Sequence, residues 1–251
     1  MKVARWLSLV YLGVTLLGAS RALAYRPFDG TDADVAELRE FELELGPTHY
    51  YRRAGRDYLI APALVLNLGV FDDTELVVDA QSYLAVGSRR SGVARVALRN
   101  DDVLLKHVFR EGCLQGKTGL SIAAEGGALT PELHGSGNFG ASLSFIASYA
   151  WPWGALHFNE WLQLTRERRL DVFNGVIAEG SRAWAVRPVA ELFYDRDSAR
   201  SQTTSLLLGA IWTARESLAV DLGLRGARMD GGYAAEARLG LTWSLELGKS
   251  H

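Results

Sequence analysis

The chain has 251 residues, a formal net charge of −2, and 27 basic against 29 acidic residues. This balance, without a basic stripe carrying interleaved aromatic residues, excludes an electrostatic nucleic-acid binder. The 26 glycines, 6 prolines and 7 tryptophans favour β-structure joined by tight turns.

The first 24 residues have the three-part layout of a secretory signal peptide. Lys2 and Arg5 precede an apolar run, and the small residues of "ALA" at 22–24 predict cleavage after Ala24. An uncleaved membrane anchor is the alternative, but the run is shorter than the roughly 20 residues of a spanning helix. We therefore expect an exported protein whose residues 25–39 form a periplasmic N-terminal segment. Its first mature residue, Tyr25, is not the cysteine of a lipoprotein.

The stretch "YLIAPALVLNLGVF" at 58–71 has a period of two. Its even-numbered positions are mostly large and apolar, whereas its odd-numbered positions are mostly small, with Asn67 as the polar exception. Successive strand side chains point to opposite faces, so this pattern predicts a strand with its even positions against lipid. Pro62 cannot donate to a strand ladder, and it predicts a local bulge or a missing hydrogen bond.

The same alternation recurs along the chain. We expect strands near 41–45, 58–70, 75–86, 103–110, 118–125, 138–151, 155–165, 171–179, 184–194, 203–212, 217–226 and 233–247. About ten residues per segment, apolar on one face and small or charged on the other, is typical of outer-membrane barrels. A soluble sandwich also alternates, but here the apolar face is long and unbroken. The sequence predicts an all-β fold: a transmembrane antiparallel up-and-down β-barrel of about 12 strands over 40–247, followed by a C-terminal tail at 248–251.

The lengths of the links between strands test the barrel prediction independently of the strand pattern. Links after even-numbered strands are mostly short and links after odd-numbered strands are longer, as in outer-membrane barrels whose N-terminus is periplasmic. Aromatic residues are expected in two interfacial girdles, with Trp151, Trp153, Trp184, Trp212 and Trp243 at the short turns and Tyr50, Tyr51, Tyr58, Tyr194 and Tyr233 at the other end.

Two segments do not fit this pattern cleanly. Glu160 falls on the apolar face, which requires either a bulge near Glu160 and Trp161 or a different register. The strand register of 88–103 stays open. The segment 93–109 fits a strand, but it also fits a segment that begins as a short amphipathic helix.

Several motifs carry a resemblance to a known family. The segment "YRPFDGTDADVAELREFELELG" matches its opening pattern at Arg26, Pro27, Phe28, Thr31, Asp32 and Ala33, and "LLKHVFREG", "GNFGA", "RPVAELF" and "LGLTW" follow in order. The chain resembles the outer-membrane β-barrel family grouped with the phenol-degradation MetA-pathway proteins. The resemblance implies an outer-membrane location and passage of small molecules, aromatic ones among them, and it carries over no catalytic residue. The chain departs from many barrels in lacking a terminal aromatic residue after Trp243, a feature that the barrel-assembly machinery reads.

Charged residues on the inward face form the main candidate site. The predicted lumen-lining network is Glu42, Glu44, Glu75, Asp79, Glu125, Glu179, Arg187, Glu191, Asp221, Arg225, Glu236 and Arg238. Barrel closure is expected to place Glu42 and Glu44 beside Glu236 and Arg238. One interpretation is a charged constriction that selects solutes. The other, which the interleaved signs favour, is a salt-bridge network that fills the barrel.

Enzymatic chemistry receives little support. No pair of the 5 histidines has metal-ligand spacing, Cys113 is the single cysteine, and no phosphate-binding loop opens a helix, so no cofactor or metal site is expected. His157 and Asn159 follow a strand that carries Ser142, Ser144 and Ser148, which leaves a membrane-embedded lipid hydrolase as a distant alternative. The sequence predicts a non-enzymatic channel or transporter for a small aromatic or hydrophobic solute, in contact with outer-membrane lipid. A closed structural or surface barrel is the main alternative.

Overall fold

Twelve strands make up almost the whole of the described chain. The computed structural model describes residues 27–53, 55–86, 96–132, 137–198 and 201–248, with the side chains of 96–100 excepted. The strands are β1 (Glu40–Arg53), β2 (Arg56–Phe71), β3 (Thr74–Val86), β4 (Val96–Arg110), β5 (Ser121–Leu129), β6 (Gly140–Trp151), β7 (Gly154–Leu164), β8 (Leu170–Gly180), β9 (Val186–Asp197), β10 (Gln202–Arg215), β11 (Leu218–Met229) and β12 (Gly232–Glu246). One 3₁₀ turn, Cys113–Gln115, lies between β4 and β5.

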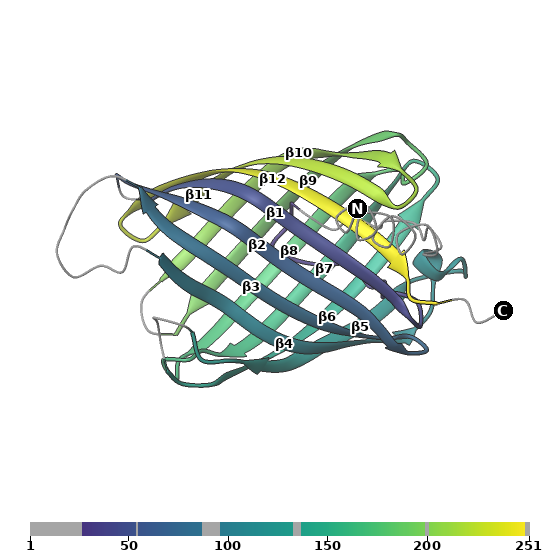
Figure 1. Ribbon diagram of the computed structural model, residues 1–251, viewed down its shortest axis with the longest axis horizontal. Coiled ribbons are helices and arrows are strands. Elements are labelled where there is room, and N and C mark those ends of the chain that lie inside the picture. The colour runs from purple at the N-terminus through teal and green to yellow at the C-terminus, as the bar shows by residue number, and fades with distance from the viewer. Residues whose placement is uncertain (1–26, 54, 87–95, 133–136, 199–200, 249–251) are drawn as a thin grey trace, which may run out of the picture.

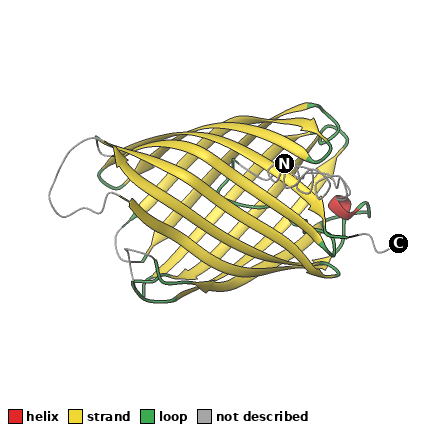
Figure 2. Ribbon diagram, in the orientation of Figure 1, coloured by secondary structure: helices red, strands yellow, loops and turns green. Residues whose placement is uncertain are grey.

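The strands close into a single barrel. Each strand pairs antiparallel with the next in the sequence, and β1 pairs with β12 to complete the ring, as Figures 1 and 2 show. This arrangement confirms the predicted up-and-down barrel and its twelve strands. The alternative of a short helix within 93–109 is wrong, because Val96–Arg110 pairs with both β3 and β5. The predicted signal peptide lies outside the described residues.

The two faces of the wall differ in chemistry. On β11, Leu222 and Leu224 are 56% and 62% exposed on the outside of the barrel, whereas Asp221, which directly precedes Leu222, is 1% exposed and points inward. The other strands repeat the pattern, with large apolar side chains outside and small, polar or charged ones inside. A continuous apolar exterior far exceeds the patch that a soluble monomer exposes, and it fits a wall in contact with lipid. Among the described residues, no helix has both the length and the apolar character needed to cross a membrane.

The irregularity expected at Pro62 is present, and it changes which residues face the lumen. The β2–β3 register shifts between Ile60 and Ala63, so the alternation reverses at that point. Ile60, expected against lipid, is 4% exposed and lines the interior. Tyr58 is reversed in the same way, and it lies opposite Tyr51 of β1 with ring centroids 5.9 Å apart, so both rings face the lumen and neither belongs to the outer girdle.

Glu160 lies on the outer face in a regular strand. The registers of β7 with β6 and with β8 run through Glu160 without a shift, and its cross-strand neighbours are Phe145 and Asn174. The bulge proposed at Glu160 and Trp161 is therefore wrong. Glu160 and Asn174 instead form a polar pair of exposed residues within the apolar exterior.

Candidate functional site: the occupied lumen

Residues 27–39, here called the N-terminal segment, cross the inside of the barrel. Successive residues contact the inward faces of β11 and β12 near residue 29, then β7, β6 and β3, before Leu38 bridges to Gly69 of β2. Figure 2, in which loops are green, shows the segment within the ring of strands. The sequence did not predict this position for the residues expected to form a periplasmic segment.

Asp29 anchors the beginning of the segment. Its carboxylate accepts hydrogen bonds from Arg225 Nη1 at 2.8 Å and from Arg238 Nη2 at 2.9 Å. Glu236 lies 2.6 Å from Arg225 and 2.9 Å from Arg238, so the two guanidinium groups are shared between the wall and the segment. Arg238 also donates to the carbonyl of Pro27 at 2.6 Å. Such charge-assisted hydrogen bonds are about twice as strong as neutral ones.

Two wall side chains bind the backbone of the segment directly. Glu191 accepts the N–H groups of Asp29 at 2.9 Å and Gly30 at 2.8 Å, one on each carboxylate oxygen. The Asn159 side chain accepts the N–H of Thr31 at 2.8 Å and donates to its carbonyl at 2.7 Å. A Cβ on Gly30 would lie 3.0 Å from Asn159 Cγ, so a glycine permits this close approach.

A second group of ion pairs holds the segment nearer the short turns that follow the even-numbered strands. Arg182, in the turn between β8 and β9, pairs with Asp32, with Asp34 at 3.2 Å and with Glu179 at 3.2 Å. Lys106 lies 3.7 Å from Asp32 and donates to the Thr31 hydroxyl at 3.2 Å.

Glu75 completes this group on β3. It lies 3.3 Å from Lys106 and accepts the N–H of Ala36 at 2.7 Å. Apolar contacts fill the spaces between the polar ones, because Phe28 packs on Val189, Ile211 and Ala219. The segment is thus bound along its length rather than at one point.

The carboxyl groups of the segment titrate differently. Burial alone would raise the pKa of Asp29, but Arg225 and Arg238 outweigh it and lower the pKa to about 2. Burial also opposes ionisation of Asp32, yet Arg182 and Lys106 lower its pKa. Burial and the neighbouring Asp32 raise the pKa of Asp34. Asp29 and Asp32 are therefore held in the ionised form by their basic neighbours, whereas Asp34 is not.

Ser148, His157 and Glu179 form a buried polar chain beneath the segment. Ser148 Oγ lies 2.8 Å from His157 Nδ1, and His157 Nε2 lies 3.4 Å from Glu179. A serine, a histidine and a carboxylate in this order are the parts of a hydrolase triad. However, Ser148 and His157 are both 0% exposed, and Ser148 Oγ accepts the N–H of Ala33 at 2.9 Å. A substrate cannot reach the Ser148 hydroxyl while the segment covers it. In this structure Ser148, His157 and Glu179 therefore hold the segment in place.

All twelve residues of the predicted network lie on the inward face. Eight of them line the cavity, and the other four, Glu179, Arg187, Glu191 and Asp221, are buried in the wall. The expected partners are partly wrong, since Glu42 and Glu44 lie opposite Ser244 and Thr242, whereas His49 and Tyr51 lie opposite Arg238 and Glu236. The stagger of β1 against β12 causes this difference, and the register shift between Leu45 and Thr48 moves the inward side chains of β1 from even to odd positions, so that His49 and Tyr51 line the lumen.

Sequence reasoning missed the residues that bind the segment most directly. Lys106, Asn159 and Arg182 were not in the predicted network, although Lys106 alternates correctly with Leu105 and His107 on β4. Arg182 lies in a turn, where strand periodicity carries no information.

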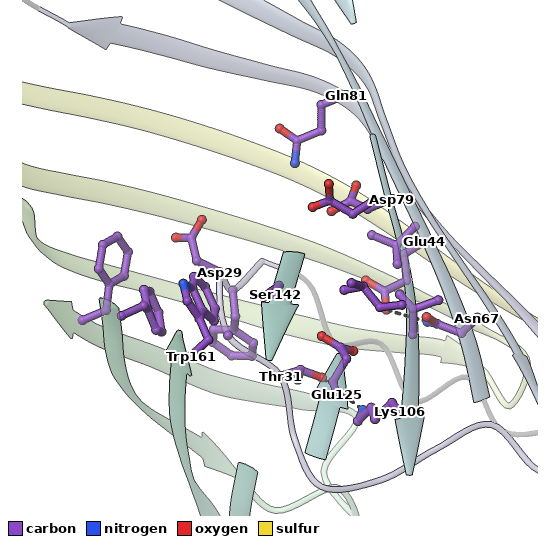
Figure 3. A pocket seen from close by; sticks show the side chains of 18 of the residues that line it. Asp29, Thr31, Glu44, Asn67, Asp79, Gln81, Lys106, Glu125, Ser142 and Trp161 are labelled. Atoms are coloured by element: carbon purple, nitrogen blue, oxygen red, sulfur yellow. Dashed lines mark hydrogen bonds between the residues drawn. The ribbon is translucent and has the colours of Figure 1, made fainter. Parts of the chain in front are cut away.

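A cavity of about 660 Å³ occupies the lumen beside the segment. Its walls include Glu44, Asp79 and Glu125 on one side and Trp161 on the other, as Figure 3 shows. Among the described residues, no group of three His, Cys, Asp or Glu side chains could hold a metal ion.

Solved structures similar to this barrel include outer-membrane channels and a porin. The COG4313 outer membrane channel from Pseudomonas putida F1 has a TM-score of 0.61 at 9% identity, covering 87% of this chain and 99% of that one. The KdgM porin gives 0.51 at 9% identity over 80% and 98%, and the CymD monoaromatic hydrocarbon channel gives 0.50 at 11% identity over 93% and 96%. No family model and no curated protein matches the chain. The barrel is therefore of the outer-membrane type, and at these identities the likeness shows the fold alone.

Proposed function

We propose that this protein is an outer-membrane channel for a small solute, including aromatic or hydrophobic ones. The observation that carries the proposal is a cavity of about 660 Å³ inside a closed barrel with an apolar exterior. Small-molecule sites are commonly cavities of about 300–1,000 Å³ lined by a few placed polar groups. The structural neighbours named as channels and porins support this function, as does the monoaromatic hydrocarbon named for one of them.

The family resemblance supports the same proposal from a different direction. The matched residues Pro27, Phe28, Thr31, Asp32 and Ala33 all lie in the N-terminal segment and contact the wall. We therefore propose that the motif specifies a segment seated in the lumen, and that kinship with the MetA-pathway barrels rests on this feature. Catalysis is not part of the proposal.

The main alternative is a closed structural barrel. The ion pairs of Asp29 and Asp32 favour it, because they hold the N-terminal segment inside the lumen. For a channel, the segment must leave its place or let solute pass beside it. The two functions differ in whether the lumen ever conducts.

Planar-bilayer conductance of the refolded protein tests the choice. We expect conductance from the full chain and a larger conductance after deletion of 28–36, which removes the segment before β1 begins at Glu40. Leu206→Val, on the outer face of β10, is the matched control. A silent full chain and a silent deletion variant, both folded by heat-modifiable gel mobility, would leave the structural barrel as the function.

A further inference from the structure

The lumen has two chemically different sides. In the closed ring β8 lies six strands from β2, so side chains of β7–β9 face those of β1–β3 across the lumen. Carboxylates from β1, β3 and β5 gather on one side, and aromatic rings from β7, β8 and β9 gather on the other. Figure 3 shows this separation, with Trp161 apart from Glu44, Asp79 and Glu125.

The aromatic side is a continuous stack. The rings of Trp161 and Phe173 are stacked with centroids 3.6 Å apart and an interplanar angle of 9°, and Phe193 follows at 4.9 Å from Phe173. Phe173 and Phe193 are 2% and 6% exposed, so they support the stack from behind. Trp161 is partly exposed and lines the cavity, which makes it the member of the stack available to a solute.

The cavity wall as a whole carries an excess of negative charge, and six of its carboxylates belong to β1, β3 and β5. Thirteen Asp or Glu residues line the cavity, against four Arg or Lys residues, within the described parts of the chain. Ser244 donates a hydrogen bond to Glu42 at 2.6 Å, and Asn67 donates one to Glu44 at 3.2 Å, so neutral wall residues orient both carboxylates. Low-dielectric walls of one charge sign focus the field and concentrate counter-ions in a cleft.

We propose that the cavity binds and passes organic cations with an aromatic or other flat apolar body. The cation would face the carboxylates of β1, β3 and β5, and the body would lie against Trp161. An ammonium group is attracted both to carboxylates and to an aromatic face, so each side contributes to a cation and neither favours an aromatic anion. This inference rests on the proposed channel function and names its solute class.

Three probes separate the two contributions in planar bilayers. Benzylammonium carries both a ring and a positive charge, ethylammonium carries the charge alone, and benzoate carries the ring with a negative charge. We expect a reversal potential in a KCl gradient that reports preference for K⁺. We also expect benzylammonium to reduce the K⁺ current at lower concentrations than ethylammonium, and benzoate to have no such effect.

Variants assign the effect to residues. Trp161→Leu should weaken block by benzylammonium about 2- to 13-fold, the range for an aromatic pair, and leave ethylammonium, which has no ring to lie on Trp161, unchanged. Glu44→Gln and Glu125→Gln, which keep side-chain volume, should lower the K⁺ over Cl⁻ permeability ratio. Glu216→Gln, in the exposed turn after β10, and Phe158→Leu, on the outer face, are the controls.

The outcomes also distinguish this inference from the function on which it rests. Absence of conductance in every folded variant would remove the channel itself. A conducting protein without cation preference, or one that benzoate blocks as well as benzylammonium, would overturn the solute class and leave the channel standing. Unchanged block in Trp161→Leu would overturn the role of the aromatic side.

Discussion

Asp29→Asn should loosen the N-terminal segment without disrupting the barrel. The pKa of Asp29, which burial alone would raise, is lowered from 3.8 to about 2 by Arg225 and Arg238. At about 1.4 kcal/mol per pKa unit, this shift corresponds to about 2.5 kcal/mol, and solvent screening at the exposed Asp29 reduces its contribution to the bound segment to about 2 kcal/mol. Loss of this contribution corresponds to an increase of about 30-fold in the population with the segment released. Arg225 and Arg238 keep Glu236 as a partner, so the wall should stay intact.

Hydrogen exchange of the segment measures this directly. The N–H groups of Asp29, Gly30 and Thr31 are bound by wall side chains and exchange only when the segment leaves them. Mass spectrometry of peptides covering 27–36 should show exchange about 30-fold faster in Asp29→Asn than in the wild type. Asp72→Asn, the same change in an exposed turn, should leave the rate unaltered. Equal rates in Asp29→Asn and the wild type would refute the anchoring role of these ion pairs.

Three further predictions concern the segment and the wall. Because the pKa of Asp29 is lowered, its stabilisation of the bound segment is complete above about pH 4 and is lost as the pH falls through about 2. Peptides of the segment should therefore become less protected from hydrogen exchange in acid. Constant protection, after correction for intrinsic exchange rates, would contradict this. Gly30→Ala places a Cβ 3.0 Å from Asn159 Cγ and should speed exchange at Thr31, whereas Gly137→Ala, which meets no neighbour, should not. Glu160→Leu should raise the unfolding free energy in lipid by about 1–2 kcal/mol, measured by urea titration in vesicles, and a loss of stability would place Glu160 in a polar contact.

Strand periodicity predicted the wall well because each inward or outward choice repeats at every second residue. The twelve strands and the inward position of residues such as Asp221 and Glu236 follow from that repetition. Strand periodicity failed where one strand has an extra residue relative to its partner, because every later side chain then points to the other face. The shift between Ile60 and Ala63 reverses Ile60, and the shift between Leu45 and Thr48 brings His49 and Tyr51 to the inward face.

The contents of the lumen were beyond such reasoning. The N-terminal segment has no strand or helix period, and its contacts are long-range, with Asp29 and Arg238 separated by 209 residues. Arg182 lies in a turn and reaches Asp32 across 150 residues. The "RPFDGTDADVAEL" motif was a signal of the segment, but it gave no indication of what the segment binds.

The contact between Asp29 and β12 also constrains the order in which the molecule is assembled. Arg238 belongs to the last strand of the chain, and that strand closes the ring against β1. The complete binding place for residues 27–29 therefore exists only after β12 is in position. Biogenesis must end with the earliest described residues meeting the final strand, so a seated segment marks a barrel whose insertion is finished.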